Sequence, residues 1–248
     1  MALLLVDVLV TTMWTSPDAP RGVDALAVAA VPDPPGWLAA LDRHPGDDES
    51  GDGRLGLHGR VETQLLAGEP FLVSEERGSW AYGAAPWQPT SKDPRGYPGW
   101  VPRAHLRPTA AAAPDPPSTT GIAVEALLAH ARRHVGLAYL WGGRSELGLD
   151  CSGLVHLSCR ELGLIVPRDA HDQHAACRPV ALGHVQAGDL YFFAHPGRRA
   201  HHVGIVTAPG VMLHAPETGQ QVIEEPLSED RRRTLVAAGR LPLLATDR

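Results

Sequence analysis

The 248-residue chain is poor in the residues that mark several protein classes. Its three cysteines are an odd number and form no Cys-x-x-Cys pair, which argues against both a disulfide framework and a zinc ribbon. There are 22 basic residues against 28 acidic ones, and a net charge of −6 is the wrong sign for a nucleic-acid-binding surface. No apolar run approaches the roughly 18–20 residues that cross a bilayer, so we expect no membrane anchoring.

The amino terminus also lacks the features of an export signal. Residues 1–10 contain no basic residue, and Asp7 interrupts their apolar run. The segment from Val8 to Thr11 is better explained as a first strand of the fold. We therefore expect a cytoplasmic protein, in a compartment where free cysteines persist.

The chain does have a globular share of apolar residues, 44%, together with 26 glycines and 23 prolines. This composition predicts a folded protein rich in turns. The segment 108–120 contains four prolines and four consecutive alanines, which is typical of a semi-rigid linker. It divides the chain into two predicted domains, residues 1–107 and residues 121–248.

The two halves differ in hydrophobic pattern. The first predicts a small β-barrel with an inserted acidic loop at 42–52, its strands at 8–14, 60–66, 70–75, 79–84 and 99–101. The second predicts helices over 121–134 and 151–162 and then strands over 189–194, 202–207, 211–215 and 221–225. Helices followed by a run of antiparallel strands indicate an α+β fold.

Cys151 is the candidate nucleophile. It follows Asp150, a good N-cap, and should therefore lie in the first turn of its helix, where free N–H groups and the helix dipole lower a thiol pKa. The alternative is that Cys151 is a small buried apolar residue. Cys159 lies on the apolar stripe of the same helix and is expected to pack in the core.

His202 and His214 are the candidate base and orienting residue. They fall on neighbouring predicted strands joined by the turn at 208–210. If that turn has three residues, the two histidines share one face of the sheet as diagonal neighbours, whereas a loop of two or four residues puts His214 on the other face. Sharing a face would suit the Cys–His–third-group arrangement of papain-like catalysis. The alternative is two polar residues on a half-exposed sheet.

A metal site is the competing explanation for a chain with thirteen histidines. His171, His174 and Cys177 recur at every third residue, but this run has neither the His-x-x-x-His nor the Cys-x-x-Cys spacing that zinc favours. We therefore expect no metal and no other cofactor.

Six motifs together resemble those of the NlpC-type cysteine peptidases, in the same order. They are Tyr139–Gly143 (YLWGG), Asp150–Val155 (DCSGLV), Pro167–Asp169 (PRD), Gly188–Leu190 (GDL), His202–Ile205 (HVGI) and His214–Pro216 (HAP). The resemblance implies a papain-like fold that cleaves peptidoglycan stem peptides. By position it makes Cys151 the nucleophile, His202 the base and His214 the orienting residue. It also implies that Tyr139 helps to stabilise the oxyanion beside the Cys151 backbone N–H.

The first half is similar to an all-β bacterial SH3-like barrel, through Gly96–Pro102 (GYPGWVP) and Ser79–Tyr82 (SWAY). An SH3-like domain before this catalytic domain resembles the γ-D-glutamyl-L-diamino-acid endopeptidases of the dipeptidyl-peptidase VI type. That likeness implies that Asp150 and Ser152 bind the free amine of a terminal L-Ala and that a tyrosine walls the pocket. We favour Tyr97 over Tyr82 for the wall.

One position departs from this subgroup, which usually has serine after the Pro-Arg-Asp motif where this chain has Ala170. The departure leaves the catalytic interpretation intact but weakens the expected L-Ala specificity. The preferred diamino acid is left open. The leading hypothesis is hydrolysis of the γ-D-glutamyl bond in free muropeptides, for cell-wall recycling. The alternatives are a peptidoglycan-binding protein with a vestigial catalytic domain and a papain-like amidase or acyltransferase acting on another amide.

Overall fold

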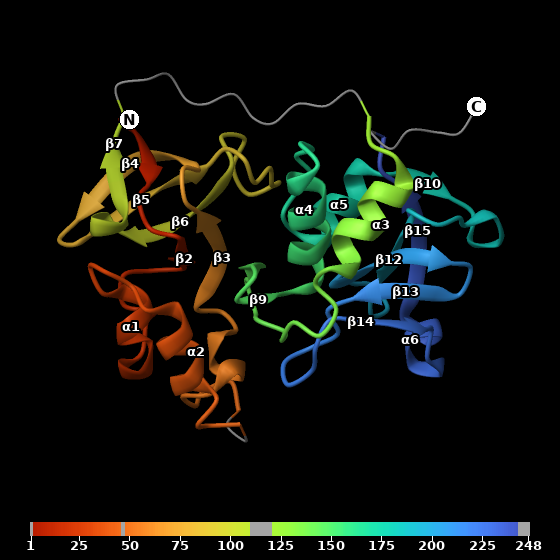
Figure 1. Cartoon of the computed structure of the whole chain (residues 1–248), viewed down its shortest axis with the longest axis horizontal. Helices are drawn as coiled ribbons and strands as arrows, with labels where there is room; N and C mark the ends of the chain where they lie inside the picture. Colours follow the sequence, from red (N-terminus) through yellow and green to blue (C-terminus); the bar gives the residue numbers. More distant parts are fainter. Residues whose placement is uncertain (1, 46–47, 110–120, 243–248) are drawn as a thin grey trace. The chain divides into compact units, whose positions relative to one another are not determined.

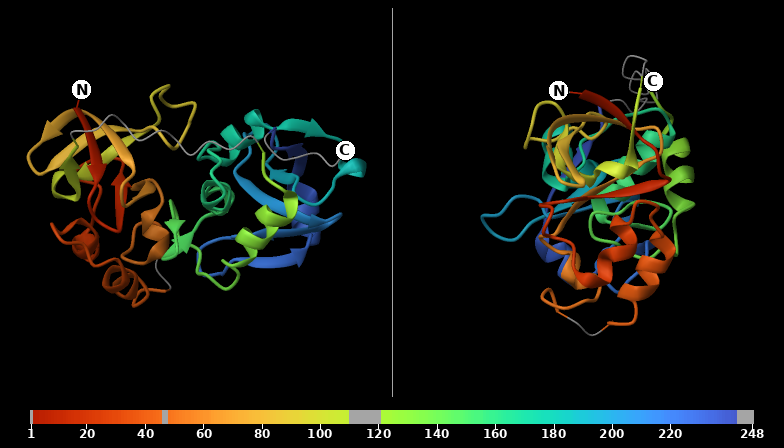
Figure 2. Two further views of the ribbon diagram at one scale, coloured as in Figure 1. Left: turned by 45° about the horizontal axis from the view of Figure 1, so that its top comes forward. Right: turned by 90° about the vertical axis from the view of Figure 1, so that its left-hand side faces the viewer.

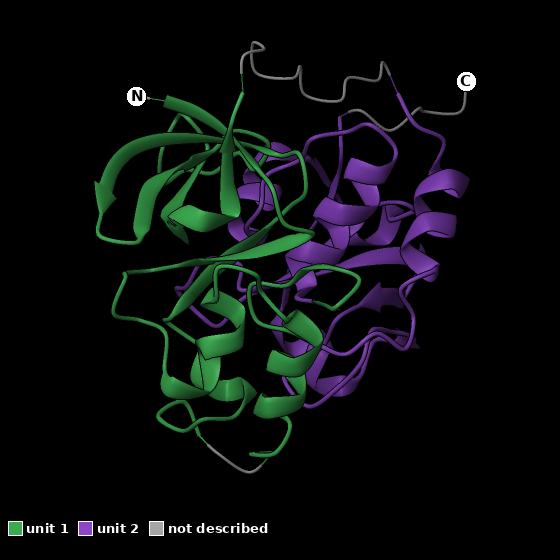
Figure 3. Ribbon diagram, turned by 60° about the vertical axis from the view of Figure 1, so that its left-hand side comes forward, with its two compact units in different colours: residues 1–115, 140–148 green, residues 116–139, 149–248 purple. Residues whose placement is uncertain are grey.

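The computed structural model describes residues 2–45, 48–109 and 121–242. The chain divides into two compact units, one of Met1–Asp115 with Leu140–Gly148 and one of Pro116–Tyr139 with Leu149–Arg248 (Figure 3). The predicted linker, 108–120, lies outside the described residues from 110 onward. A short piece of the predicted second domain, Leu140–Gly148, thus groups with the first unit.

The N-terminal unit is built on a seven-stranded antiparallel sheet with the order β3-β2-β6-β5-β4-β1-β7 (Figure 1). Its strands are β1 (Ala2–Val6), β2 (Val10–Trp14), β3 (Val61–Leu66), β4 (Pro70–Arg77), β5 (Trp80–Ala85), β6 (Tyr97–Pro102) and β7 (Leu106–Pro108). One face buries an apolar cluster that includes Met13, Leu65 and Phe71. The predicted first strand is β2, which begins at Val10, and β1 precedes it as a strand that the sequence analysis missed.

Between β2 and β3 the chain forms a helical insertion, so the expected all-β barrel is an incomplete description of this unit. Helix α1 spans Ala25–Val28 and α2 spans Pro34–Leu41, where Asp33 caps the backbone N–H of Gly36. Trp37 of α2 is buried beside Trp14, with ring centroids 6.2 Å apart. This aromatic contact fixes the insertion to the sheet.

Over its described residues, 121–139 and 149–242, the C-terminal unit combines a six-stranded sheet with four α-helices, which is the mixed α and β architecture that its sequence predicts. The sheet order is β10-β15-β11-β12-β13-β14, with β10 (Arg178–Val180), β11 (Leu190–Phe193), β12 (His202–Ala208), β13 (Val211–His214), β14 (Ile223–Pro226) and β15 (Leu235–Arg240). The helices are α3 (Val124–Arg132), α4 (Cys151–Glu161), α5 (Ala170–Ala176) and α6 (Glu229–Thr234).

Helix α4 is the central helix of this unit. It packs on β12 and also contacts α3 and α5, and Figure 2 shows these helices on one side of the sheet. The two predicted helices match α3 and α4, and the four predicted strands match β11 to β14 within two residues at each end. The sequence analysis missed α5, α6, β10 and β15, although β15 supplies an interior strand between β10 and β11.

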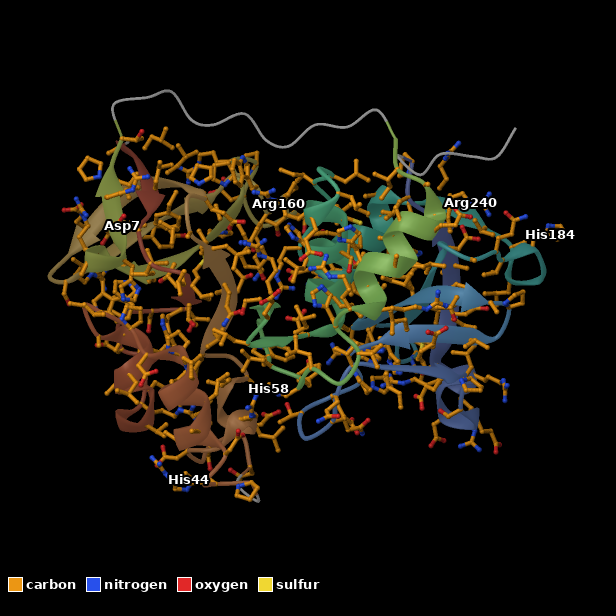
Figure 4. All side chains as sticks on the ribbon, in the orientation of Figure 1. Asp7, His44, His58, Arg160, His184 and Arg240 are labelled. Carbon is orange, nitrogen blue, oxygen red and sulfur yellow. The ribbon has the colours of Figure 1, made fainter. Side chains whose placement is uncertain are left out.

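Two of the histidines lie at the periphery of their units. His44 and His184 are exposed, and Figure 4 shows them well away from the centre of their units. Arg240, also labelled there, ends β15 and pairs with Asp189 at 2.7 Å. Among the described residues, no helix is both long enough and apolar enough to span a membrane.

Candidate active site

Helix α4 presents Cys151 at its first position. Asp150 is in extended conformation, with ψ near 176°, and its carboxylate accepts the Gly153 backbone N–H at 2.6 Å, so the helix is capped as the sequence predicts. Gly163, with φ near +80°, follows the helix end in the left-handed conformation that glycine adopts at low cost. Cys151 is 7% exposed. Cys159 is fully buried on the same helix, in the core position expected for it.

The Cys151 thiol lies against the beginning of β12. Its Sγ donates to the His201 carbonyl at 3.9 Å, and the Val203 backbone N–H points toward the sulfur closely enough to favour its thiolate form. These two residues flank His202. The structure thus brings the candidate nucleophile to the strand end that carries the candidate base.

His202 and His214 lie on the same face of the sheet and are in direct contact. His202 Nε2 and His214 Nδ1 are 2.8 Å apart, and the two rings meet edge to face. Beyond them, His214 Nε2 lies 3.1 Å from Oε1 of Glu225, which belongs to β14. The three side chains form one line of hydrogen bonds that ends at the surface.

A β-bulge produces this arrangement. Ala208 pairs with Val211, so only Pro209 and Gly210 form the turn, and a two-residue turn alone would put the histidines on opposite faces. The register shifts between Val206 and Ala208, where β12 has one residue more than β13. This extra residue returns the two histidines to the same face of the sheet. The predicted pairing is therefore present, but the three-residue turn assumed for it is not.

Gly204 keeps the space between the two strands open. A Cβ at this position would lie 2.7 Å from the Met212 sulfur and 3.3 Å from the Cβ of His214. Any larger residue would push the β13 side chains away from His202. The glycine of the HVGI motif thus has a packing role beside the histidine pair.

The direction of the hydrogen bonds follows from the carboxylate, which can only accept. Glu225 accepts from His214 Nε2–H, so a neutral His214 accepts at Nδ1 from His202 Nε2–H. The remaining nitrogen of His202, Nδ1, then carries a free lone pair. This tautomer prepares His202 to accept a proton at Nδ1.

Burial dominates the pKa values of these groups. It raises the pKa of the Cys151 thiol to about 12, with help from the nearby Asp150 charge. The expected lowering by backbone N–H groups is present, from Val203 and Ser152, but burial outweighs it. Burial also lowers the pKa of His202 well below 6.5 and that of His214 to about 4. At neutral pH the resting pair is therefore a thiol and a neutral imidazole.

This resting state predicts how fast Cys151 reacts with iodoacetamide as pH changes. Because only the thiolate reacts, the rate should rise about tenfold per pH unit between pH 6 and pH 9, without a plateau. The measurement uses a variant in which Cys159 and Cys177 are alanine, with Cys151→Ala as the background. A rate already level at pH 6 would reveal a preformed thiolate–imidazolium pair and contradict the account.

Arg168 is a residue of this region to which the sequence analysis gave no role. Its guanidinium binds both oxygens of Asp150, at 3.0 and 2.7 Å, and also contacts the Ser152 hydroxyl at 2.9 Å. Arg168 is 1% exposed and Asp150 8%. The Pro-Arg-Asp motif, which contains Arg168, was the feature of the sequence that could have identified it. Asp150 and Ser152 are thus joined to each other and to a buried cation.

Removing the Arg168 charge should destabilise the fold strongly. In Arg168→Met the Asp150 carboxylate is left buried without its partner, so the free energy of unfolding should fall by about 3–5 kcal/mol. Urea unfolding measures this loss. The matched control is Arg133→Met, an exposed residue for which a change within about 0.5 kcal/mol is expected. A loss of less than about 1 kcal/mol in Arg168→Met would show that the pair is not a structural requirement.

Tyr139 is buried and lies in the segment that joins α3 to β8. Its backbone bridges to Leu149 and donates to the Gln220 carbonyl at 2.8 Å. Burial is the main cause of a strongly raised phenol pKa, and electrostatic interactions with Cys151 and Asp150 raise it further. The phenol is therefore neutral and keeps its proton as a hydrogen-bond donor.

Three further positions were singled out in the sequence: Tyr97, Tyr82 and Ala170. Tyr97 belongs to β6 of the N-terminal unit, where its hydroxyl accepts from Lys92 Nζ at 2.7 Å, and the same ammonium binds Glu62 at 2.6 Å. Tyr82 packs against Trp100 with the two rings tilted and their centroids 5.2 Å apart. Ala170 is buried at the first position of α5.

Among the described residues, the acidic and histidine side chains close enough to share a metal ion are Asp169, His171 and Asp172. His174 instead packs on the ring of Phe192, at 4.8 Å between centroids. The run of His171, His174 and Cys177 considered from the sequence is therefore not gathered into one ligand set.

Known proteins resemble this chain over most of its length. Residues 136–238 match the model of the NlpC/P60 family. The chain is 31% identical to a Bacillus subtilis gamma-D-glutamyl-L-lysine dipeptidyl-peptidase over 86% of this chain and 90% of that protein. It is 26% identical to the Bacillus cereus protein of the same name, over 90% and 86%. A crystal structure of a Bacillus cereus NlpC/P60 family protein superimposes with a TM-score of 0.85 at 24% identity, covering 97% and 99% of the two chains.

Proposed function

Because this chain belongs to the NlpC/P60 family of cysteine peptidases, which hydrolyse peptidoglycan peptides, we propose that it cleaves the γ-D-glutamyl bond to an L-diamino acid. The proposed substrate is a stem peptide that begins with a free L-Ala. The observation that carries the proposal is the hydrogen-bonded line of His202, His214 and Glu225, together with the Cys151 thiol on the His201 carbonyl at the start of β12.

In the proposed mechanism, Cys151 attacks the γ-carbonyl carbon while its thiol proton passes to His202 Nδ1. The positive charge on His202 is stabilised by His214 and Glu225 through the hydrogen bonds already present. Since the thiol pKa is near 12, the proton leaves only as the carbon–sulfur bond forms. The resulting oxyanion accepts hydrogen bonds from the Cys151 backbone N–H and the neutral Tyr139 hydroxyl.

Collapse of this intermediate breaks the carbon–nitrogen bond. His202 gives its proton to the departing amine of the L-diamino acid, and the L-Ala-γ-D-Glu acyl group stays on Cys151 as a thioester. Water, deprotonated by His202, then attacks the thioester. The free dipeptide leaves, and the proton returns to the Cys151 sulfur.

For the amine end of the substrate we propose Asp150 and Ser152. The Asp150 Oδ1 already accepts from Gly153, Ser152 and Arg168, whereas Oδ2 accepts from Arg168 and has a second lone pair to offer. The names of the two most similar Bacillus relatives support the position of the cut. Arg168 neutralises much of the Asp150 charge, so the gain from binding an ammonium should be moderate.

We propose further that the N-terminal sheet is a bacterial SH3-like barrel and that Tyr97 contributes to amine recognition. The antiparallel strands β1 to β7 and the position of the GYPGWVP motif on β6 support the first proposal. The contact of the Lys92 ammonium with the Tyr97 hydroxyl and ring supports the second, because a primary ammonium is the group that a free L-Ala amine would present.

We propose that the protein acts in cytoplasmic recycling of wall peptides, and the free-amine requirement supports a substrate already released from the wall. In an intact strand the L-Ala amine is tied up in an amide, so a free amine arises only after the stem peptide has been released from the glycan. An amide-cleaving reaction must therefore supply the substrate. The products are a dipeptide and the remainder of the stem.

Mass spectrometry of the products tests this proposal. L-Ala-γ-D-Glu-L-Lys and its diaminopimelate counterpart should each yield L-Ala-γ-D-Glu, and acetylating the L-Ala amine should lower kcat/KM by about tenfold or more, for the loss of one charge-assisted hydrogen bond. Changing the substrate avoids Asp150 variants, which would leave Arg168 buried without its partner.

Three results would contradict the proposal. Equal cleavage of free and acetylated peptides would show that the amine is not recognised. Cleavage at another amide, or transfer of the acyl group to an added amine, would favour an amidase or acyltransferase. Binding without any turnover would indicate a wall-binding protein.

A further inference from the structure

Residues 140–148 form a loop that starts and ends beside the candidate catalytic groups. At its base, Tyr139 bridges to Leu149, and the Leu149 N–H donates to the Ala138 carbonyl at 3.3 Å. The loop itself contains the paired strands β8 (Arg144–Ser145) and β9, whose range Gly148–Leu149 reaches the base. Tyr139 immediately precedes the 140–148 loop, and Cys151 begins α4 just after it.

The loop is held within the N-terminal unit by a buried polar cluster. Arg144 is 0% exposed and forms an ion pair with the buried carboxylate of Glu69. Its Nε also donates to the Gln64 carbonyl at 3.2 Å, and its backbone N–H donates to the Gln64 side chain at 3.0 Å. The Ser145 hydroxyl donates to the same side-chain oxygen at 2.8 Å.

The same loop covers the edge of the N-terminal sheet. Strand β3 is an edge strand, whose outward carbonyls need partners that the sheet does not supply. Trp141 Nε1 donates to the Val61 carbonyl at 3.1 Å, and Arg144 Nε donates to the Gln64 carbonyl. Gly142, with φ near +71°, permits the close approach, since a Cβ there would lie 2.6 Å from a Val61 methyl. The contact is therefore extensive and specific.

We propose that Arg144 is a positioning residue for the reaction. Its bonds to Glu69 and Gln64 fix the 140–148 loop, and the loop fixes its two ends, Tyr139 and the start of α4. The proposal rests on the roles assigned above to Tyr139 and Cys151. Because misplacement of a reacting group by about 1 Å can cost on the order of 100-fold in rate, loss of the Arg144 contacts should lower kcat by about 10- to 100-fold.

The competing explanation is that Arg144 only stabilises the fold. Replacing a buried ion pair by apolar side chains of similar volume often preserves stability, so the double variant Arg144→Met/Glu69→Met separates the two explanations. A positioning role predicts that its Tm stays near wild type while kcat remains 10- to 100-fold low and KM changes less than about threefold. Recovery of kcat together with Tm would overturn the proposal.

Two controls keep the result interpretable. Leu4→Ala, in an apolar cluster of the same unit that contains no residue of the 140–148 loop, should lower Tm and leave kcat unchanged when measured well below the unfolding transition. In a double-mutant cycle, Tyr139→Phe should cost less in the Arg144→Met/Glu69→Met background than in the wild type, because the phenol there is already misplaced. Full additivity would overturn the proposal. All assays use whichever amide the wild type cleaves, so an error in the proposed substrate does not affect them.

Discussion

Replacing Cys151 by alanine is expected to lower kcat for murein peptides by at least about 10⁴-fold, with little change in the unfolding free energy. Alanine at the first position of α4 keeps the helix and its Asp150 cap, but no atom remains to form the thioester. Initial rates at saturating peptide measure the effect, and circular dichroism verifies the fold.

The other two cysteines are matched controls within the same chain. Cys159 lies on the same helix but is fully buried in the core, and Cys177 follows α5. Cys159→Ala should lower Tm and leave kcat within about threefold of wild type, and Cys177→Ala should change neither greatly. Comparable loss of activity in a folded Cys159→Ala protein would refute the assignment of Cys151.

The second large effect is expected at His202. His202→Ala removes the group that accepts the thiol proton and later protonates the leaving amine, so kcat should fall by about 10³- to 10⁴-fold. Kinetics of this variant together with Cys151→Ala should be strongly non-additive, since neither group works without the other.

Effects should diminish along the line of hydrogen bonds. His214→Ala leaves His202 without its orienting contact and should cost about 10- to 100-fold in kcat. Glu225→Gln should cost less than about tenfold, because the Glu225 side chain is 38% exposed and its interaction is partly screened by water. A larger loss at Glu225 than at His202 would show that the proton travels by another route.

Much of the site was predictable because its residues lie in short local patterns. The Asp150–Cys151 pair before an apolar stripe fixes a capped helix, and the structure has that helix. The short apolar runs that contain His202 and His214 predict two strands, which β12 and β13 confirm. Whether the two histidines share a face depended on the turn. A β-bulge puts them on the same face, and no residue type in the sequence predicts that bulge.

Other features depend on long-range packing, and among those named here only Arg168, through the Pro-Arg-Asp motif, had a signal in the sequence. In the sequence, Glu225 is one acidic residue of a predicted strand. It comes to lie beside His214 because β14 pairs with β13. Arg168 and Arg144 are buried only because Asp150 and Glu69 neutralise them, from positions 18 and 75 residues away. The lowered thiol pKa expected from the helix start was wrong, because burial opposes ionisation more strongly than the backbone N–H groups favour it.

The most direct test of the central claim is covalent labelling with a chloromethyl ketone built on the γ-carboxyl of L-Ala-γ-D-Glu. Such a compound places its reactive carbon where the proposed scissile bond lies. We expect peptide mapping to find the label on Cys151 alone, and inactivation to be about tenfold or more slower when the L-Ala amine is acetylated. Labelling of Cys159 or Cys177 instead, or equal rates for the two compounds, would contradict the account.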